Sequence, residues 1–220
     1  MSAPRVRPIR GLPEPLPAGE RLLWQGAPDW RALGRRAFHT RKVAVYFAIL
    51  IAWRAVIAVD DGQSITGVIG AALPLVVLAL GALGLLNLFA WLSSRATVYT
   101  ITSRRLVIHC GIALPMTVNL PFRMIHAAGL KSFGDGKGDI VLALPKGQRV
   151  AYLQLWPHVR PWRMRQPEPM LRCVPDAASV AAVLVRSLAA ATGGQANIGA
   201  IVSAPAELPA RTPPRASAAA

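Results

Sequence analysis

The sequence predicts an α+β membrane protein: a two-helix transmembrane hairpin followed by a small antiparallel β-barrel with a C-terminal capping helix. Residues 65–92 contain no charge and are long enough to cross a bilayer as a helix. From residue 97 onward, short β-branched segments alternate with turn residues, which is typical of antiparallel strands. After residue 176, apolar side chains recur at helical spacing and predict one amphipathic helix.

The composition favours a lipid bilayer over nucleic acid. The chain has 220 residues, 53% of them apolar, and its 25 Lys and Arg against 10 Asp and Glu give a formal charge of +15. Nucleic-acid-binding modules are also basic, but they rarely contain such long uncharged runs, so we expect no nucleic-acid partner. The two cysteines, Cys110 and Cys173, lie far apart without metal-ligand spacing, which favours buried thiols over a disulfide or a zinc site.

The hairpin is predicted to consist of helices at about 43–59 and 65–92. The second helix would be about 42 Å long, more than a ~30 Å hydrocarbon core requires. The first is near the minimum length and carries Arg54, whose side chain we expect to reach the interface at the acidic turn 60–61; contact with an acidic group of a partner helix is the alternative. Glycines in the second helix permit either flexibility or close approach of another helix.

The basic residues predict the orientation of the hairpin. Nine of them precede residue 43, none lies in the loop 60–64, and Arg95, Arg104 and Arg105 follow the second helix. By the positive-inside rule, both termini face the cytoplasm and the acidic loop faces the other side. The chain is therefore predicted to be a multi-pass membrane protein with both termini cytoplasmic.

The domain outside the membrane is predicted from short strands and a helix. The helix begins near Pro175 and Asp176, and its Val180, Leu184 and Leu188 share one face. Strands followed by one such helix are the order of a pleckstrin-homology-like (PH-like) domain, in which the helix covers an open end of the barrel. The expected strands are residues 97–102, 105–109, 116–120, 127–132, 140–144 and 150–155.

These elements divide the chain into four parts. Residues 1–42 form a cytoplasmic N-terminal segment and residues 43–92 form the hairpin. Residues 95–192 form the PH-like cytoplasmic domain. Residues 193–220 are rich in Ala and Pro without helical periodicity, and we expect them to be a flexible tail.

Catalytic, metal and cofactor sites are not predicted. The four histidines lack metal-ligand spacing, and neither membrane helix contains a histidine that would ligate a pigment. Asp135 and Asp139 are close in sequence, but the glycine-rich stretch 134–138 favours a hairpin turn over a hydrolase site or a phosphate-binding loop. We therefore expect no enzyme. An enzyme acting on pigment or lipid would require His126, His158 and Asp139 to meet in one pocket.

Two segments are candidates for contacts with a partner or with the membrane surface. Residues 155–169 combine two Trp, four Pro and three Arg, which favours a rigid interface; a proline-rich connector whose tryptophans pack on the domain is the alternative. Residues 24–36 form a second aromatic and basic patch before the first helix. The candidate contacts are Trp24, Trp30, Arg35, Arg36, Trp156, His158, Arg160, Trp162, Arg163 and Arg165.

Three stretches carry a more specific resemblance. Residues 11–30, 36–47 and 152–162 resemble the PuhB family, the photosynthetic complex assembly proteins of purple bacteria, and the likeness extends over roughly residues 11–191. In addition, residues 19–26 and 99–112 resemble the wider group of bacterial membrane proteins with a PH-like domain. This wider resemblance supports the predicted fold but indicates little about the function of the protein.

The PuhB resemblance implies a non-catalytic assembly factor for the photosynthetic reaction centre and its core light-harvesting complex. It implies a place in the bacterial inner, intracytoplasmic membrane and contacts with reaction-centre subunits, most plausibly the H polypeptide, and with the core antenna. Membrane lipids are further expected partners, and a homo-oligomer is left open. The alternative function is a general membrane-anchored lipid- or protein-binding PH-like module unrelated to photosynthesis.

Overall fold

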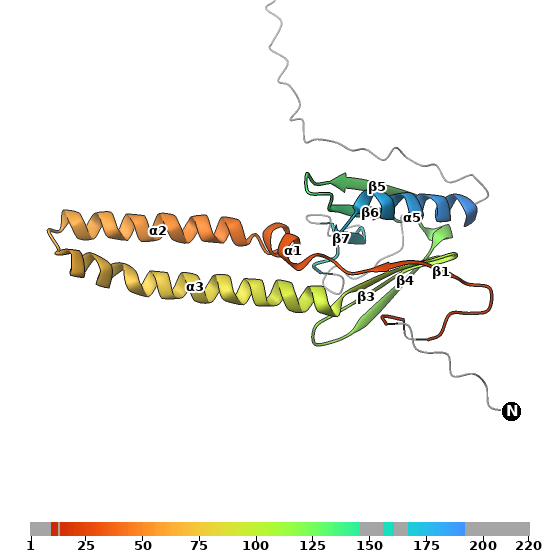
Figure 1. Ribbon diagram of the computed structural model, residues 1–220, viewed down its shortest axis with the longest axis horizontal. Helices are drawn as coiled ribbons and strands as arrows, with labels where there is room; N and C mark the ends of the chain where they lie inside the picture. Colours follow the sequence, from red (N-terminus) through yellow and green to blue (C-terminus); the bar gives the residue numbers. More distant parts are fainter. Residues whose placement is uncertain (1–9, 13, 146–155, 161–166, 192–220) are drawn as a thin grey trace, which may run out of the picture.

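The computed structural model describes residues 10–12, 14–145, 156–160 and 167–191 of the chain (Figure 1). Two long helices, α2 (Thr40–Asp60) and α3 (Ile65–Ala96), form a hairpin that extends away from a domain of strands and one helix. We call α2 and α3 the apolar hairpin. Both helices are long and apolar enough to cross a membrane, and only 6% of the most apolar window of each is buried.

The helices of the apolar hairpin extend beyond the predicted limits. α2 begins three residues earlier than expected and α3 ends four residues later, because the polar residues at these ends continue the helical hydrogen bonds. The Ser64 hydroxyl caps α3 by accepting a hydrogen bond from the backbone N–H of Gly67. Gly62 has a φ of +68°, which suits the tight turn between the helices.

The first sheet contains four antiparallel strands in the order β1-β2-β3-β4. They are β1 (Leu22–Gly26), β2 (Val98–Thr102), β3 (Arg105–Cys110) and β4 (Met116–Pro121). The last three confirm predicted strands to within a residue. β1 was missed, and it places part of the N-terminal segment in the sheet of the domain that was predicted to begin at residue 95.

A partly buried ion pair holds the chain just before β1. The Glu20 carboxylate accepts hydrogen bonds from Nε and Nη2 of Arg105 at 2.8 and 3.0 Å and from the Thr102 hydroxyl at 2.7 Å. Burial opposes ionisation of Glu20, but these hydrogen bonds and the arginine charge lower the pKa of its carboxyl below the usual value. The pair therefore helps to set where β1 meets β2.

The second sheet has the order β5-β6-β7 and is also antiparallel. Its strands are β5 (Ala127–Ser132), β6 (Gly138–Ala143) and β7 (Met170–Val174), and the 3-10 turn η1 (Phe122–Met124) precedes them. The glycine-rich stretch 134–138 connects β5 to β6 as the predicted hairpin turn. β7 was missed, and the predicted strand 150–155 lies outside the described residues.

The predicted small β-barrel is not closed in the part of the chain that the structure describes. Its strands form two separate sheets, because η1 turns the chain away from β4 before β5 begins a new ladder. α5 (Ala177–Ala191) packs against η1, β5 and β6, so that the helix closes the core between the sheets. The α+β arrangement with a C-terminal helix fits a PH-like domain.

The helix α5 has the predicted buried face but begins later than predicted. Val180, Leu184 and Leu188 are buried in the core together with residues of both sheets, including Tyr99 and Ile140. Asp176 has a φ of +48°, a left-handed conformation that a residue inside a right-handed helix does not adopt. The helix therefore starts at Ala177 rather than at the expected Pro175.

The short helix α1 (Trp30–Arg36) joins the apolar hairpin to the domain. The Asp29 carboxylate caps it by accepting a hydrogen bond from the N–H of Ala32 at 2.8 Å. Gly34 faces Ala90 of α3, where a Cβ atom would lie only 3.4 Å from the alanine side chain. On its other side, Leu33 packs with residues of the second sheet. α1 therefore fixes the base of the hairpin against the domain.

Candidate functional site

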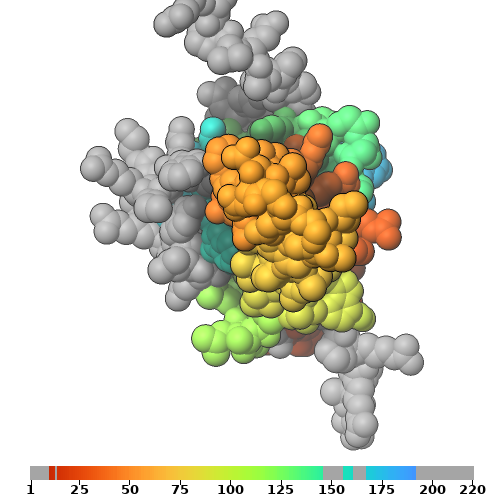
Figure 2. Space-filling view, turned by 90° about the vertical axis from the view of Figure 1, so that its left-hand side faces the viewer, coloured from red at the N-terminus to blue at the C-terminus, as the bar shows by residue number. Residues whose placement is uncertain are grey.

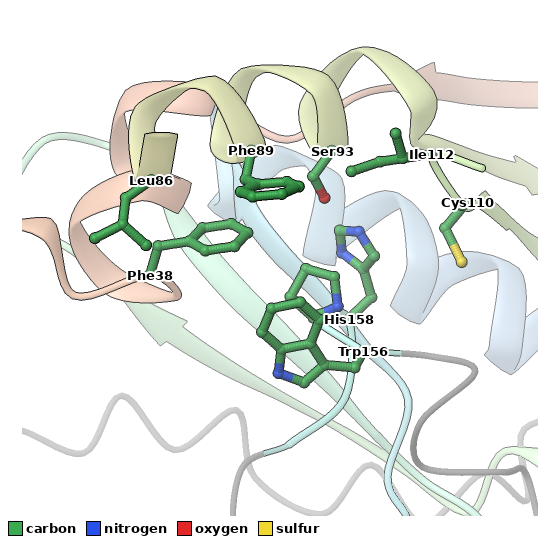
Figure 3. A pocket seen from close by; sticks show the side chains of 10 residues that line it. Phe38, Leu86, Phe89, Ser93, Cys110, Ile112, Trp156 and His158 are labelled. Atoms are coloured by element: carbon green, nitrogen blue, oxygen red, sulfur yellow. The ribbon is translucent and has the colours of Figure 1, made fainter. Parts of the chain in front are cut away.

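A cavity of about 400 Å³ lies where the base of the apolar hairpin meets the domain (Figure 3). α3 contributes Leu86, Phe89 and Ser93, which share one helical face because they are three and four residues apart. Residues 110–112, at the end of β3, and residues 156–158 form further walls. The volume falls within the range of small-ligand pockets. We call this cavity the junction pocket.

The rim of the junction pocket is aromatic and open to the surroundings. Phe38, between α1 and α2, contacts Trp156 edge to face with ring centroids 5.5 Å apart. The side chains of Trp156 and Phe89 are 52% and 44% exposed. Aromatic and aliphatic walls of this kind favour an apolar ligand, because its burial removes apolar surface from water.

A chain of hydrogen bonds forms the polar floor of the pocket. The Tyr99 hydroxyl accepts the backbone N–H of Arg172 at 3.1 Å and donates to Nδ1 of His158 at 2.7 Å. The Nε2–H of His158 then donates to the Thr97 hydroxyl at 2.9 Å. That hydroxyl donates in turn to the Ser93 carbonyl oxygen at 2.7 Å. The network therefore holds a neutral histidine and connects α3, β2, β7 and residues 156–160.

One predicted contact is fully buried and another is half-buried. His158 is only 1% exposed, so the prediction that it contacts a partner or the membrane is wrong. Trp24 of β1 is half-buried and packs against the main core. The burial of both side chains depends on residues distant in the sequence, because Tyr99 and Thr97 surround the histidine and β2 pairs with the strand that carries the tryptophan.

Trp30, Arg35 and Arg36 are exposed on α1. The guanidinium of Arg31 lies 5.2 Å from the ring centroid of Trp30, and that of Arg36 lies 3.5 Å from the centroid of Phe133. Arg36 thereby contacts the turn between β5 and β6, whereas Trp30 and Arg35 form the exposed face of α1.

The proline-rich segment is described in part. Trp156 lies on the rim of the junction pocket, and Arg160 is exposed and forms an ion pair with Glu168 at 2.8 Å. Trp162, Arg163 and Arg165 lie outside the described residues. Phe38, Leu86 and Phe89 were not predicted as pocket residues, since the sequence of a uniformly apolar helix does not indicate which of its sides contacts the domain.

Comparison with known families identifies the architecture. Residues 43–188, about two thirds of the chain, match the family described as the bacterial PH domain. The chain belongs to the bacterial PH domain family. A protein of Rhodobacter capsulatus is 37% identical over 199 residues, covering 90% of this chain and 91% of its own length; it is described as an uncharacterised 23.7 kDa protein in the puhA 5′ region. No solved structure matches the chain.

Asp139 and Cys173 have structural roles in this bacterial PH domain. An Asp139 carboxylate oxygen accepts the backbone N–H of Cys173 at 2.8 Å. Burial raises the pKa of the Asp139 carboxyl, and burial together with the charge of Asp139 raises the pKa of the Cys173 thiol to about 12. A thiol with so high a pKa is a poor nucleophile at neutral pH.

An enzymatic function would require His126, His158 and Asp139 to meet in one pocket. In the described part of the bacterial PH domain these three residues do not meet. His158 uses both ring nitrogens in the network below the junction pocket. Asp139 pairs with backbone of β7, and His126 is exposed before β5. The described residues include no group of three or more His, Cys, Asp or Glu that could hold a metal ion.

The electrostatics of the network keep His158 neutral. Complete burial and the nearby positive charge of Arg172 lower the pKa of the His158 imidazole to about 3. Protonation at Nδ1 would also be unfavourable because the Tyr99 hydroxyl donates its hydrogen bond to this nitrogen, so that two donors would then face each other. The PH domain and the hairpin are thus joined by a histidine that stays neutral at every physiological pH.

We expect the stability of the PH domain to fall on acidification because of His158. The folded-state pKa of about 3 lies below the ~6.5 of an unfolded histidine, so the unfolded chain binds the extra proton first. The histidine's contribution is complete above pH 6.5 and is lost as the pH falls towards 3, at about 1.4 kcal/mol per pH unit. Denaturant unfolding in detergent at pH 6.5, 5.8 and 5.0 measures this slope.

A matched variant separates His158 from other groups. His158→Gln offers one acceptor and one donor but does not titrate. The unfolding free energy of this variant should therefore change less with pH than that of the wild-type chain, by nearly the whole amount that His158 contributes to the slope. Comparing the two chains cancels the contribution of Asp139, whose raised pKa has the opposite sign. Equal slopes in both chains would show that His158 is protonated in the folded state.

Proposed function

We propose that this bacterial PH domain protein is a non-catalytic membrane assembly factor of the PuhB family for the photosynthetic reaction centre and its core light-harvesting complex. The observation that carries the proposal is the relative described as a protein in the puhA 5′ region, because the likeness extends over nine tenths of both chains. The resemblance of residues 11–30, 36–47 and 152–162 to that family supports it further.

Membrane insertion of the apolar hairpin is the first part of the proposal. α2 has 21 residues, about 31 Å at 1.5 Å per residue, which matches a ~30 Å hydrocarbon core. Large side chains such as Ile49, Trp53 and Val77 are more than 60% exposed, a surface that a water-soluble protein would have to cover. The basic residues before α2 and after α3 support cytoplasmic termini in a bacterial inner membrane.

The second part is recognition of a reaction-centre component, the H polypeptide, by the exposed face of α1. Trp30 and Arg35 lie there beside the base of the hairpin, at the level where a neighbouring membrane protein leaves the bilayer. An aromatic ring flanked by guanidinium groups is a typical centre of a protein interface. A non-catalytic role is consistent with the structural use of His158 and Asp139 described above.

Deletion of the gene in its photosynthetic host tests the proposal. Near-infrared absorption of isolated membranes should show a marked loss of the core-complex bands, and a plasmid copy of the gene should restore them. A copy with Arg35→Glu should restore less than half of the core complex, because it reverses the charge on the proposed contact face. Arg186→Glu, on α5 and also exposed, is the matched control and should restore the bands fully.

Unchanged spectra after deletion would contradict the assembly role. A general membrane-anchored module unrelated to photosynthesis would then be the better account, and a coding region outside photosynthesis genes would favour it. Equal restoration by Arg35→Glu and the wild-type copy would retain the assembly role but exclude α1 as the contact.

A further inference from the structure

The junction pocket lies beside the proposed membrane surface. Counting about 20 residues, or ~30 Å, from Ile65 places Leu86 at the cytoplasmic edge of the hydrocarbon core. Phe89 then lies about 4.5 Å further into the interfacial region and Ser93 about 10 Å further. The pocket therefore extends from the cytoplasmic edge of the hydrocarbon core to the depth of the lipid headgroups.

A second apolar element faces the same level of the membrane. β3 runs antiparallel to β2, which leaves the end of α3, so the β3–β4 turn returns towards the hairpin. Figure 1 shows this turn on the hairpin side of the domain, and Figure 2, which looks at that side, shows light-green residues beside the yellow helix. At this turn Ile112 is 49% exposed and Leu114 is 83% exposed. Exposed apolar side chains at the interface favour insertion among lipids.

The lining of the junction pocket suits the acyl chain of a phospholipid and the ester carbonyl at its end. Leu86, Phe89 and Trp156 provide apolar walls that an acyl chain can fill. In Figure 3 the Ser93 hydroxyl points inward between Phe89 and His158, where it can donate a hydrogen bond to an ester carbonyl. His158 supplies no free donor or acceptor, because both ring nitrogens are bonded within the protein.

The charge near the pocket selects the headgroup. Phe38 lines the pocket, and Arg41 and Lys42 follow within the first turn of α2, both exposed. Each basic residue near an anionic membrane surface contributes about 1 kcal/mol of attraction, which corresponds to about a fivefold preference for anionic over zwitterionic lipid. The formal charge of the whole chain, +15, acts in the same direction.

We propose that the junction pocket binds one anionic glycerophospholipid of the cytoplasmic leaflet, with an acyl chain between α3 and Trp156 and the headgroup near Arg41 and Lys42. The bound lipid fills the gap between the hairpin and the domain and so stiffens their connection. This site rests on the proposed membrane insertion and is independent of the assembly role.

Native mass spectrometry of the full chain tests the site. The chain is reconstituted into nanodiscs containing equal amounts of phosphatidylglycerol and phosphatidylcholine, and it is then extracted into a mild detergent. We expect one retained phosphatidylglycerol per chain, in about fivefold excess over phosphatidylcholine. Leu86→Trp fills the pocket and should reduce retention about tenfold. Leu85→Trp, on the adjacent exposed position of α3 outside the pocket, should retain the lipid like the wild-type chain.

A second matched pair of variants tests the opposite wall of the pocket, at the β3–β4 turn. Ile112→Trp should reduce retention, whereas Leu114→Trp, on the same turn but outside the pocket lining, should not. Equal retention within either pair, absence of retained lipid, or equal retention of the two headgroups would overturn the proposal. A chain that fails to enter nanodiscs would overturn membrane insertion as well, whereas an inserted chain without retained lipid would overturn only the lipid site.

Discussion

His158→Ala is expected to lower the free energy of unfolding by about 3–5 kcal/mol. The substitution leaves the hydroxyl of the buried Tyr99 without its acceptor and the hydroxyl of the buried Thr97 without its donor. It also creates a cavity where a fully buried ring was. Because a single domain has only about 5–15 kcal/mol of stability, this change removes a large part of it.

The measurement is denaturant unfolding of the full chain in detergent, followed by tryptophan fluorescence. His126→Ala is the matched control, since that histidine is exposed and its loss should change the unfolding free energy by no more than about 0.5 kcal/mol. A change of under 1 kcal/mol in His158→Ala would mean that the network does not hold the hairpin to the domain.

Gly111→Ala is expected to lower the free energy of unfolding by about 2–4 kcal/mol. Gly111 has a φ of +115°, a conformation that residues with a Cβ atom rarely adopt. A Cβ atom there would also collide with the backbone of Leu114, so the β3–β4 turn would have to open. Since this turn forms one wall of the junction pocket, phosphatidylglycerol retention should fall together with stability.

Gly134→Ala is the control for this prediction. Gly134 lies in the turn between β5 and β6, where an added Cβ would meet no atom within 4 Å. We expect its unfolding free energy to stay within about 0.5 kcal/mol of the wild-type value. Similar losses in Gly111→Ala and Gly134→Ala would indicate a general effect of replacing glycine in turns rather than the geometry of the β3–β4 turn.

Local patterns in the sequence were sufficient to predict the helices of the apolar hairpin and most of the strands. The uncharged run 65–92 and the alternation within 105–109 are properties of neighbouring residues, so the order of the chain already reveals them. The apolar face of α5 was visible for the same reason. Its start was not, because the left-handed conformation of Asp176 depends on its surroundings rather than on helical periodicity.

Only the tertiary structure could reveal β1 and the division of the strands into two sheets. Leu22–Gly26 is a short apolar segment whose pairing partner, Val98–Thr102, lies beyond the entire hairpin. β7 likewise pairs with β6 across the proline-rich segment. Such ladders depend on long-range contacts that bring distant segments together, and these leave little trace in local composition.

The sequence by itself therefore determined the class of the protein: two apolar helices long enough to span a membrane, a small α+β domain of the bacterial PH family, and a strongly basic composition. The tertiary structure decided which of its side chains are buried and which can contact a ligand or a partner. It buries His158 between Tyr99 and Thr97 and opens a pocket between α3 and Trp156. The physical reason is that burial and cavities arise where distant segments meet, whereas hydropathy and periodicity describe each segment alone.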